Sequence, residues 1–142
     1  MVPTLQTAKQ EAAAKSDPRK LRELMDRVCA LAAEHEVASV VVGVAGRDGD
    51  PEIAEFMDYV ESALRMEDAI FRMTRERSVL FLSDVDRARA EGIVGRLVDS
   101  FGEQVALPKP PAVALGFAEI PAGPNPPLLR DVLLAAFPAR SR

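Results

Sequence analysis

Two short runs rich in β-forming residues, Asp68 to Met73 and Ser78 to Leu82, lie on either side of four polar residues. The link between them reads Thr74-Arg75-Glu76-Arg77. Two such runs around a short polar link are typical of a β-hairpin. The sequence therefore predicts an antiparallel pair of strands near the middle of the chain.

Helix and strand signals extend on both sides of this hairpin. The valine-rich run from Val37 to Ala45 predicts a strand buried on both faces. Asp17-Pro18 and Asp50-Pro51 each place a capping aspartate before a proline at a first helical position. Apolar residues recur at helical spacing after both dipeptides and again between residues 90 and 101. The remaining predicted elements are a short edge strand at 104–107, a strand at 112–119 and a helix at 128–137.

The order of these elements predicts the fold class. After residue 36 the order is β-α-β-β-α-β, with an extra helix at each end. Right-handed crossovers turn this order into an α+β, ferredoxin-like palm, a four-stranded antiparallel sheet with two helices on one face. Residues 4–15 are strong helix formers without an apolar stripe. We therefore expect a helical extension at 1–15 and one domain at 16–142.

The composition limits the chemistry that the chain can carry. A net charge of −4, with both signs mixed along the chain, does not favour nucleic acid or an acidic membrane as a partner. The single cysteine, Cys29, excludes an internal disulfide, and the single histidine, His35, argues against a zinc site. The chain has neither a signal-like N-terminus nor an apolar run near the ~20 residues of a membrane helix. We expect a cytoplasmic protein with no metal and no cofactor.

The segment around the hairpin resembles the centre of GGDEF domains, the bacterial diguanylate cyclases. In that family an R-x-x-D element lies five residues ahead of a G-G-D/E-E-F turn, and an apolar strand follows the turn. Arg65 and Asp68 supply the first element with this spacing. Further segments similar to the family lie at 16–18, 63–72, 113–118 and 128–139. The resemblance implies the palm fold of nucleotidyl cyclases.

The same resemblance implies a loss of catalysis. The family holds two metal ions with an acidic residue at the end of the first strand and another in the hairpin turn. Here Val42 to Ala45 end the first strand without a ligand, and Glu76 alone matches the hairpin acid. Asp48 and Asp50 lie beyond the strand and are the remaining candidate ligands. The degenerate turn consists of Thr74, Arg75, Glu76, Arg77 and Ser78, with side chains in place of the two glycines that admit the nucleotide.

A second site of the family bears on binding. In active members the R-x-x-D element binds the product, cyclic di-GMP, as an inhibitor. The resemblance implies that Arg65 donates to the guanine O6 and N7 and that Asp68 accepts from the guanine N–H groups. It also implies that Arg72, Arg75 or Arg77 meets the phosphates. The competing interpretation is that Arg65 and Asp68 form a surface ion pair at a helix-to-strand junction.

We therefore expect a catalytically inactive GGDEF-like domain of bacterial signalling that binds a protein partner or self-associates. The alternative is a cyclic di-GMP receptor that uses Arg65 and Asp68. Residual nucleotide cyclisation is the remaining enzymatic alternative.

Overall fold

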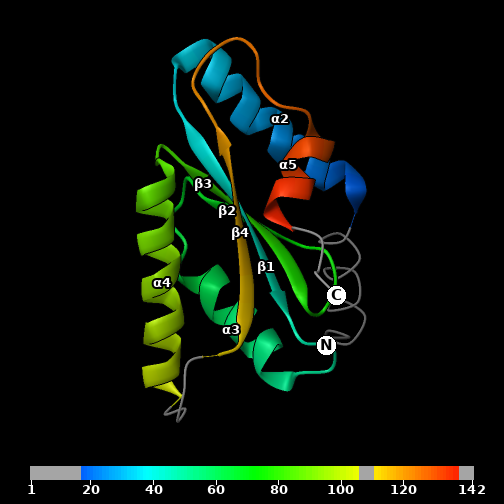
Figure 1. The fold of residues 1–142 in the computed structure, drawn as a ribbon, viewed down its shortest axis with the longest axis vertical. Helices are drawn as coiled ribbons and strands as arrows, with labels where there is room; N and C mark the ends of the chain where they lie inside the picture. The colour runs from blue at the N-terminus through cyan, green and yellow to red at the C-terminus, as the bar shows by residue number, and fades with distance from the viewer. Residues whose placement is uncertain (1–16, 106–110, 138–142) are drawn as a thin grey trace, which may run out of the picture.

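The computed structural model describes residues 17–105 and 111–137. Figure 1 shows a twisted sheet flanked by helices. The predicted extension at 1–15 lies outside the described residues, so the domain boundary at residue 16 stays a prediction. The elements in chain order are α2 (Pro18–His35), β1 (Ser39–Gly46), α3 (Pro51–Ala63), β2 (Ala69–Arg72), β3 (Arg77–Ser83), α4 (Arg87–Gln104), β4 (Val113–Ile120) and α5 (Leu129–Ala136).

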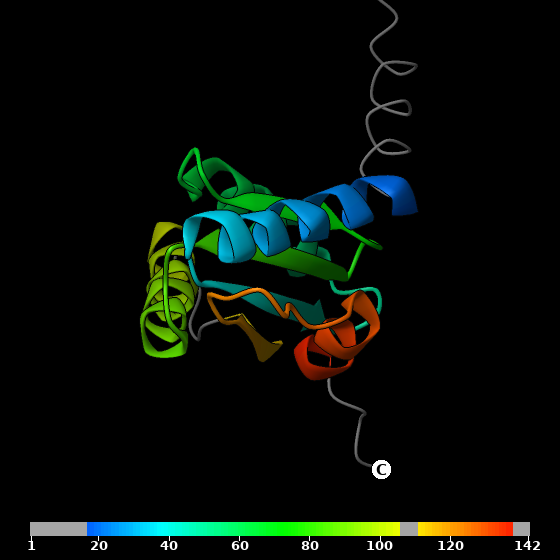
Figure 2. The ribbon, with the colours of Figure 1, turned by 90° about the horizontal axis from the view of Figure 1, so that it is seen from above.

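The sheet has the strand order β2-β3-β1-β4, and every neighbouring pair is antiparallel. This is the order of a ferredoxin-like palm, in which β1 and β3 lie in the centre. The predicted hairpin is present as β2 and β3, with Arg72 opposite Ser78. The predicted α+β palm is therefore confirmed. Figure 2 shows β4 at one margin of the sheet, next to β1.

The two faces of the sheet are covered by different pairs of helices. Alternate side chains of a strand point to opposite faces, so β1 sends Val40, Val42 and Val44 into one core and Val41 into the other. Helices α3 and α4 cover the first core, and α2 and α5 cover the second. The extra helices at the two ends of the palm thus form a third layer. This double burial explains why β1 is almost entirely apolar.

The helix starts follow the sequence signals closely. The Asp17 side chain accepts a hydrogen bond from the backbone N–H of Arg19 at 3.0 Å, and the Asp50 side chain accepts one from Glu52 at 2.9 Å. Both caps precede a proline at the start of the helix. No helix in the described part of the chain is long and apolar enough to cross a membrane.

One predicted element is wrong at the two of its positions that the structure describes, 104 and 105. The edge strand predicted at 104–107 begins inside α4, which continues to Gln104, and Val105 lies in a turn. The last turns of α4 are held by Phe101, whose ring packs edge-on against Phe56 with 5.4 Å between centroids. This tertiary contact extends the helix beyond the point where the local sequence favours a strand.

Helix α5 lies directly on the backbone of β1 and β4. Gly43 and Gly116 face each other across these strands. A Cβ atom at either glycine would come within 2.7 Å of the Ala136 carbonyl carbon. The glycine pair therefore makes room for the last turn of α5, and it fixes where this helix ends on the sheet.

Candidate functional site

The degenerate turn joins β2 to β3 at one end of the sheet. The backbone N–H groups of Met73 and Thr74 both donate to the Arg77 carbonyl, at 3.0 and 3.1 Å. Thr74, Arg75 and Glu76 form the turn, while Arg77 and Ser78 begin β3. The Thr74 hydroxyl accepts from the Glu76 N–H at 3.3 Å, so a side chain closes the turn where the family has glycine. The turn is thus a closed hairpin loop, stabilised by its own residues.

Glu76 links this turn to the loop that follows β1. Its carboxylate accepts a hydrogen bond from the Gly49 N–H at 3.1 Å, and its carbonyl accepts one from Gly46 at 2.8 Å. Gly49 has a φ of 78°, a conformation that glycine adopts without strain. The acid that matches the family's hairpin ligand therefore holds two loops together.

The residues at this end of the sheet do not fit a pair of metal ions. Val44, Ala45 and Gly46 close β1 and carry no oxygen donor on a side chain. In the described residues no group of three or more His, Cys, Asp and Glu side chains is arranged to hold a metal ion. Asp50, one of the two replacement ligands considered from sequence, instead caps α3.

A cavity of about 1010 Å³ opens beside the end of β1, and we call it the β1-end cavity. Two of its lining side chains are cationic, Arg47 and Arg77, and one is anionic, Asp48. The Arg77 guanidinium lies 5.8 Å from the centroid of the Phe137 ring, within the range of a cation–π contact. Its other lining residues are Ala45, Gly46, Ala112, Val113, Ala114, Leu115 and Ala136. Sequence reasoning missed this cavity because its walls come from four separated parts of the chain.

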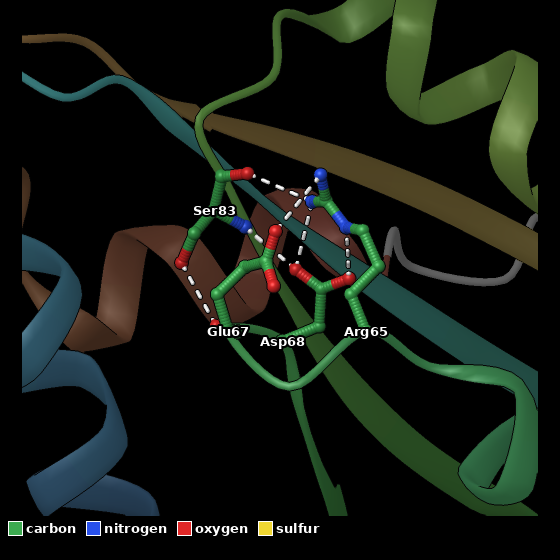
Figure 3. A network of polar contacts seen from close by, with 4 residues as sticks. All are labelled: Arg65, Glu67, Asp68 and Ser83. Atoms are coloured by element: carbon green, nitrogen blue, oxygen red, sulfur yellow. Dashed lines mark hydrogen bonds and ion pairs between the residues drawn. The ribbon is translucent and has the colours of Figure 1, made fainter.

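Arg65 and Asp68 meet at the junction between α3 and β2, as the spacing predicted (Figure 3). Arg65 Nε donates to Asp68 Oδ2 at 2.7 Å, and Arg65 Nη2 donates to Asp68 Oδ1 at 2.9 Å. The Asp68 side chain is only 2% exposed, whereas that of Arg65 is 37% exposed. The hydrogen bond to Asp68 raises the pKa of the Arg65 guanidinium above its usual value. Arg65 and Asp68 therefore form a bidentate ion pair in which the Asp68 carboxylate is buried.

The same pair also binds the end of β3. The Ser83 N–H donates to Asp68 Oδ1 at 3.1 Å, and the Ser83 carbonyl accepts from Arg65 Nη2 at 2.8 Å (Figure 3). The Ser83 hydroxyl donates to the Glu67 carbonyl at 3.2 Å. Both oxygens of Asp68 are thus engaged, and the segment at 65–68 is joined to the end of β3. We call Arg65, Asp68 and Ser83 the junction lock.

The third residue expected at a cyclic di-GMP site lies elsewhere. Arg72 is at the far end of β2 from Asp68, a separation of roughly 13 Å for four strand residues. Its Nη2 contacts Asp58 at 2.8 Å and Glu61 at 3.4 Å, both on α3. Arg72 Nε and the Ser78 hydroxyl are buried and have no hydrogen-bond partner among the described residues. The structure thus brings Arg65 and Asp68 together and holds Arg72 against α3.

Solved structures from bacteria resemble this fold. A fragment of PelD from Pseudomonas aeruginosa PAO1 has a TM-score of 0.65 at 17% identity, over 83% of this chain and 44% of that one. The FimX GGDEF domain from the same species has a TM-score of 0.62 at 13% identity, over 83% of this chain and 82% of that domain. The chain has a GGDEF-like fold.

A DGC protein from Thermotoga maritima supports the same conclusion, with a TM-score of 0.58 at 14% identity over 83% of this chain and 89% of that protein. No protein-family model and no curated protein sequence matches the chain. The GGDEF-like domain spans less than half the length of the PelD fragment that it matches. The likeness predicted from the hairpin is therefore confirmed at the level of the fold.

Proposed function

We propose that this GGDEF-like domain has no cyclase activity and acts in signalling by binding another protein chain. The observation that carries this proposal is the hydrogen bond from Gly49 to the Glu76 carboxylate. Cyclisation of a nucleoside triphosphate on this fold depends on two metal ions that neutralise phosphate charge. The one matching acid serves a structural role here, and the end of β1 offers no second acid.

The competing proposal is a cyclic di-GMP receptor at Arg65 and Asp68. Its support is the placement of both side chains at the α3–β2 junction, where the resemblance puts the inhibitory site. Asp68, however, already accepts three hydrogen bonds, and a guanine would have to replace them. Glu67 and Asp84 add negative charge beside Arg65, which disfavours an anionic dinucleotide. The junction lock therefore fits a structural role better than a ligand site.

One set of titrations separates these proposals. The full chain is incubated with GTP and Mg²⁺, and the products are resolved by chromatography and mass spectrometry. We expect no cyclic di-GMP to form; its formation at a rate above that of a heat-denatured sample would refute the noncatalytic assignment. Calorimetry with GTP tests the β1-end cavity, where Arg47 and Arg77 are the groups that would meet phosphates.

Calorimetry with cyclic di-GMP tests the receptor alternative. We expect no saturable heat for the wild-type chain. Saturable binding that Arg65→Ala abolishes would establish the receptor instead. Arg96→Ala, which removes an exposed arginine on α4, is the matched control for the loss of one positive charge.

A further inference from the structure

Among the described strands, β4 has a neighbour on only one side. The strand order places β2 and β4 at the two edges of the sheet. Soluble proteins protect such edges with short strands, charged residues, prolines or bulges. β2 is only four residues long and ends at Arg72. β4 is eight residues long, carries Glu119 as its single charge, and pairs with β1 in unbroken register.

The register shows which groups of β4 point outward. The Gly46 N–H donates to the Glu76 carbonyl on the β3 side, and hydrogen-bonding direction alternates along an antiparallel strand. Odd-numbered residues of β1 therefore bond toward β4, where Gly43 faces Gly116 and Ala45 faces Ala114. The outward N–H and C=O groups of β4 accordingly belong to Val113, Leu115, Phe117 and Glu119. Across the described residues, no hydrogen bond engages these groups.

The side chains of this edge complement a second copy of the same strand. Leu115 is 37% exposed, and it is the only large apolar side chain exposed on a strand in the described part of the chain. With a two-fold axis at Leu115, Val113 would face Phe117 of the partner subunit, and Leu115 would face its own counterpart. On the opposite face of the sheet the same register pairs Ala114 with Gly116, so small residues meet small residues.

A register shifted by two residues fits less well. A two-fold axis at Phe117 would put Leu115 opposite the charged Glu119. The register centred on Leu115 places Glu119 at the end of the paired region. It joins three pairs of outward-facing residues, which exchange about six backbone hydrogen bonds.

We propose that two copies of this chain associate through antiparallel pairing of β4 with β4, centred on Leu115. This inference rests on the proposed interaction role and names both its surface and its partner. The two sheets then form one continuous sheet of eight strands, and Leu115 is buried at the centre. Figure 2 shows β4 at this margin of the sheet, with α5 packed beside it.

Light scattering and sedimentation equilibrium on the full chain test this assembly. We expect a mass of twice 15.4 kDa at tens of micromolar concentration. Leu115→Pro removes the central outward N–H while leaving the bonds to β1 in place, and an edge strand tolerates proline at such a position. We expect it to raise the dimer dissociation constant at least tenfold. Leu134→Asn, which changes an exposed apolar residue on α5, is the control and should leave the dimer unchanged.

A second variant keeps the test decisive if Leu115→Pro does not fold. Leu115→Lys places two like charges opposite each other at the axis, and it should also yield a monomer with a wild-type circular dichroism spectrum. In a Cys29→Ser background, a short bismaleimide should cross-link Leu115→Cys and not Glu119→Cys. A monomeric wild type, or a dimer that resists both Leu115 variants, would overturn the β4 inference. Neither result bears on cyclic di-GMP formation, which tests the noncatalytic proposal separately.

Discussion

The substitution Gly116→Ala tests how closely α5 packs on the sheet, because it adds one methyl group at their contact. The new Cβ would lie 2.7 Å from the Ala136 carbonyl carbon and 2.9 Å from the Ala135 carbonyl oxygen, both backbone atoms that have little freedom to move. Overpacking of this kind costs about 1–3 kcal/mol. Replacing glycine inside a strand would by itself favour the folded state by about 0.5–1 kcal/mol. We therefore expect Gly116→Ala to lose about 1–2 kcal/mol of unfolding free energy.

Urea unfolding followed by circular dichroism is the assay, with all proteins at one concentration. With a slope of about 2 kcal/mol per molar urea, the expected loss lowers the midpoint by about 0.5–1 M. Gly92→Ala in α4 is the matched control, because nothing lies within 4 Å of its added Cβ. The control should raise the unfolding free energy by about 0.5–1 kcal/mol, since alanine is the better helix former.

Gly116→Ala and Gly92→Ala are expected to change the unfolding free energy in opposite directions, so the two results are easily told apart. Gly43→Ala meets the same backbone atoms of Ala136 and should behave like Gly116→Ala. If Gly116→Ala were as stable as the wild type, or were stabilised to the same degree as Gly92→Ala, then α5 would not rest on the glycine pair. The close packing of α5 on β1 and β4 would then be refuted.

Three further predictions concern single groups. Asp68→Ala leaves the Ser83 N–H without its acceptor and Arg65 without its ion-pair partner, so we expect a loss of about 1–3 kcal/mol in urea unfolding; an unchanged midpoint would contradict the junction lock. Asp50→Ala removes the cap of α3 and should lower the unfolding free energy by about 1 kcal/mol in the same assay. The control is Asp99→Ala on the exposed side of α4, which should lower it less. Burial raises the pKa of the Cys29 thiol, so its alkylation by iodoacetamide should reach half its maximal rate at a higher pH in the folded chain than in urea; equal midpoints would contradict this.

The sequence by itself determined most of the described secondary structure and the order of its elements, with the edge strand predicted at 104–107 as the exception. The Asp-Pro dipeptides start α2 and α3 because their capping bonds involve residues only two positions away. The hairpin and the buried strand β1 follow from local alternation and from a continuous apolar run. The meeting of Arg65 with Asp68 was also predictable, since the two residues are three positions apart at one helix end. Interactions between near neighbours in the sequence leave a readable local signal.

Only the tertiary structure decided the roles of the long-range contacts. Ser83 completes the junction lock from 15 residues away, and Glu76 reaches Gly49 across 27 positions. The β1-end cavity and the packing of α5 on Gly43 and Gly116 also depend on segments that meet only after folding. The free edge of β4 is visible only once the strand order is known. A pattern of residues specifies which side chains are apolar or charged, but the pairing of distant segments fixes which backbone and side-chain groups remain unpartnered.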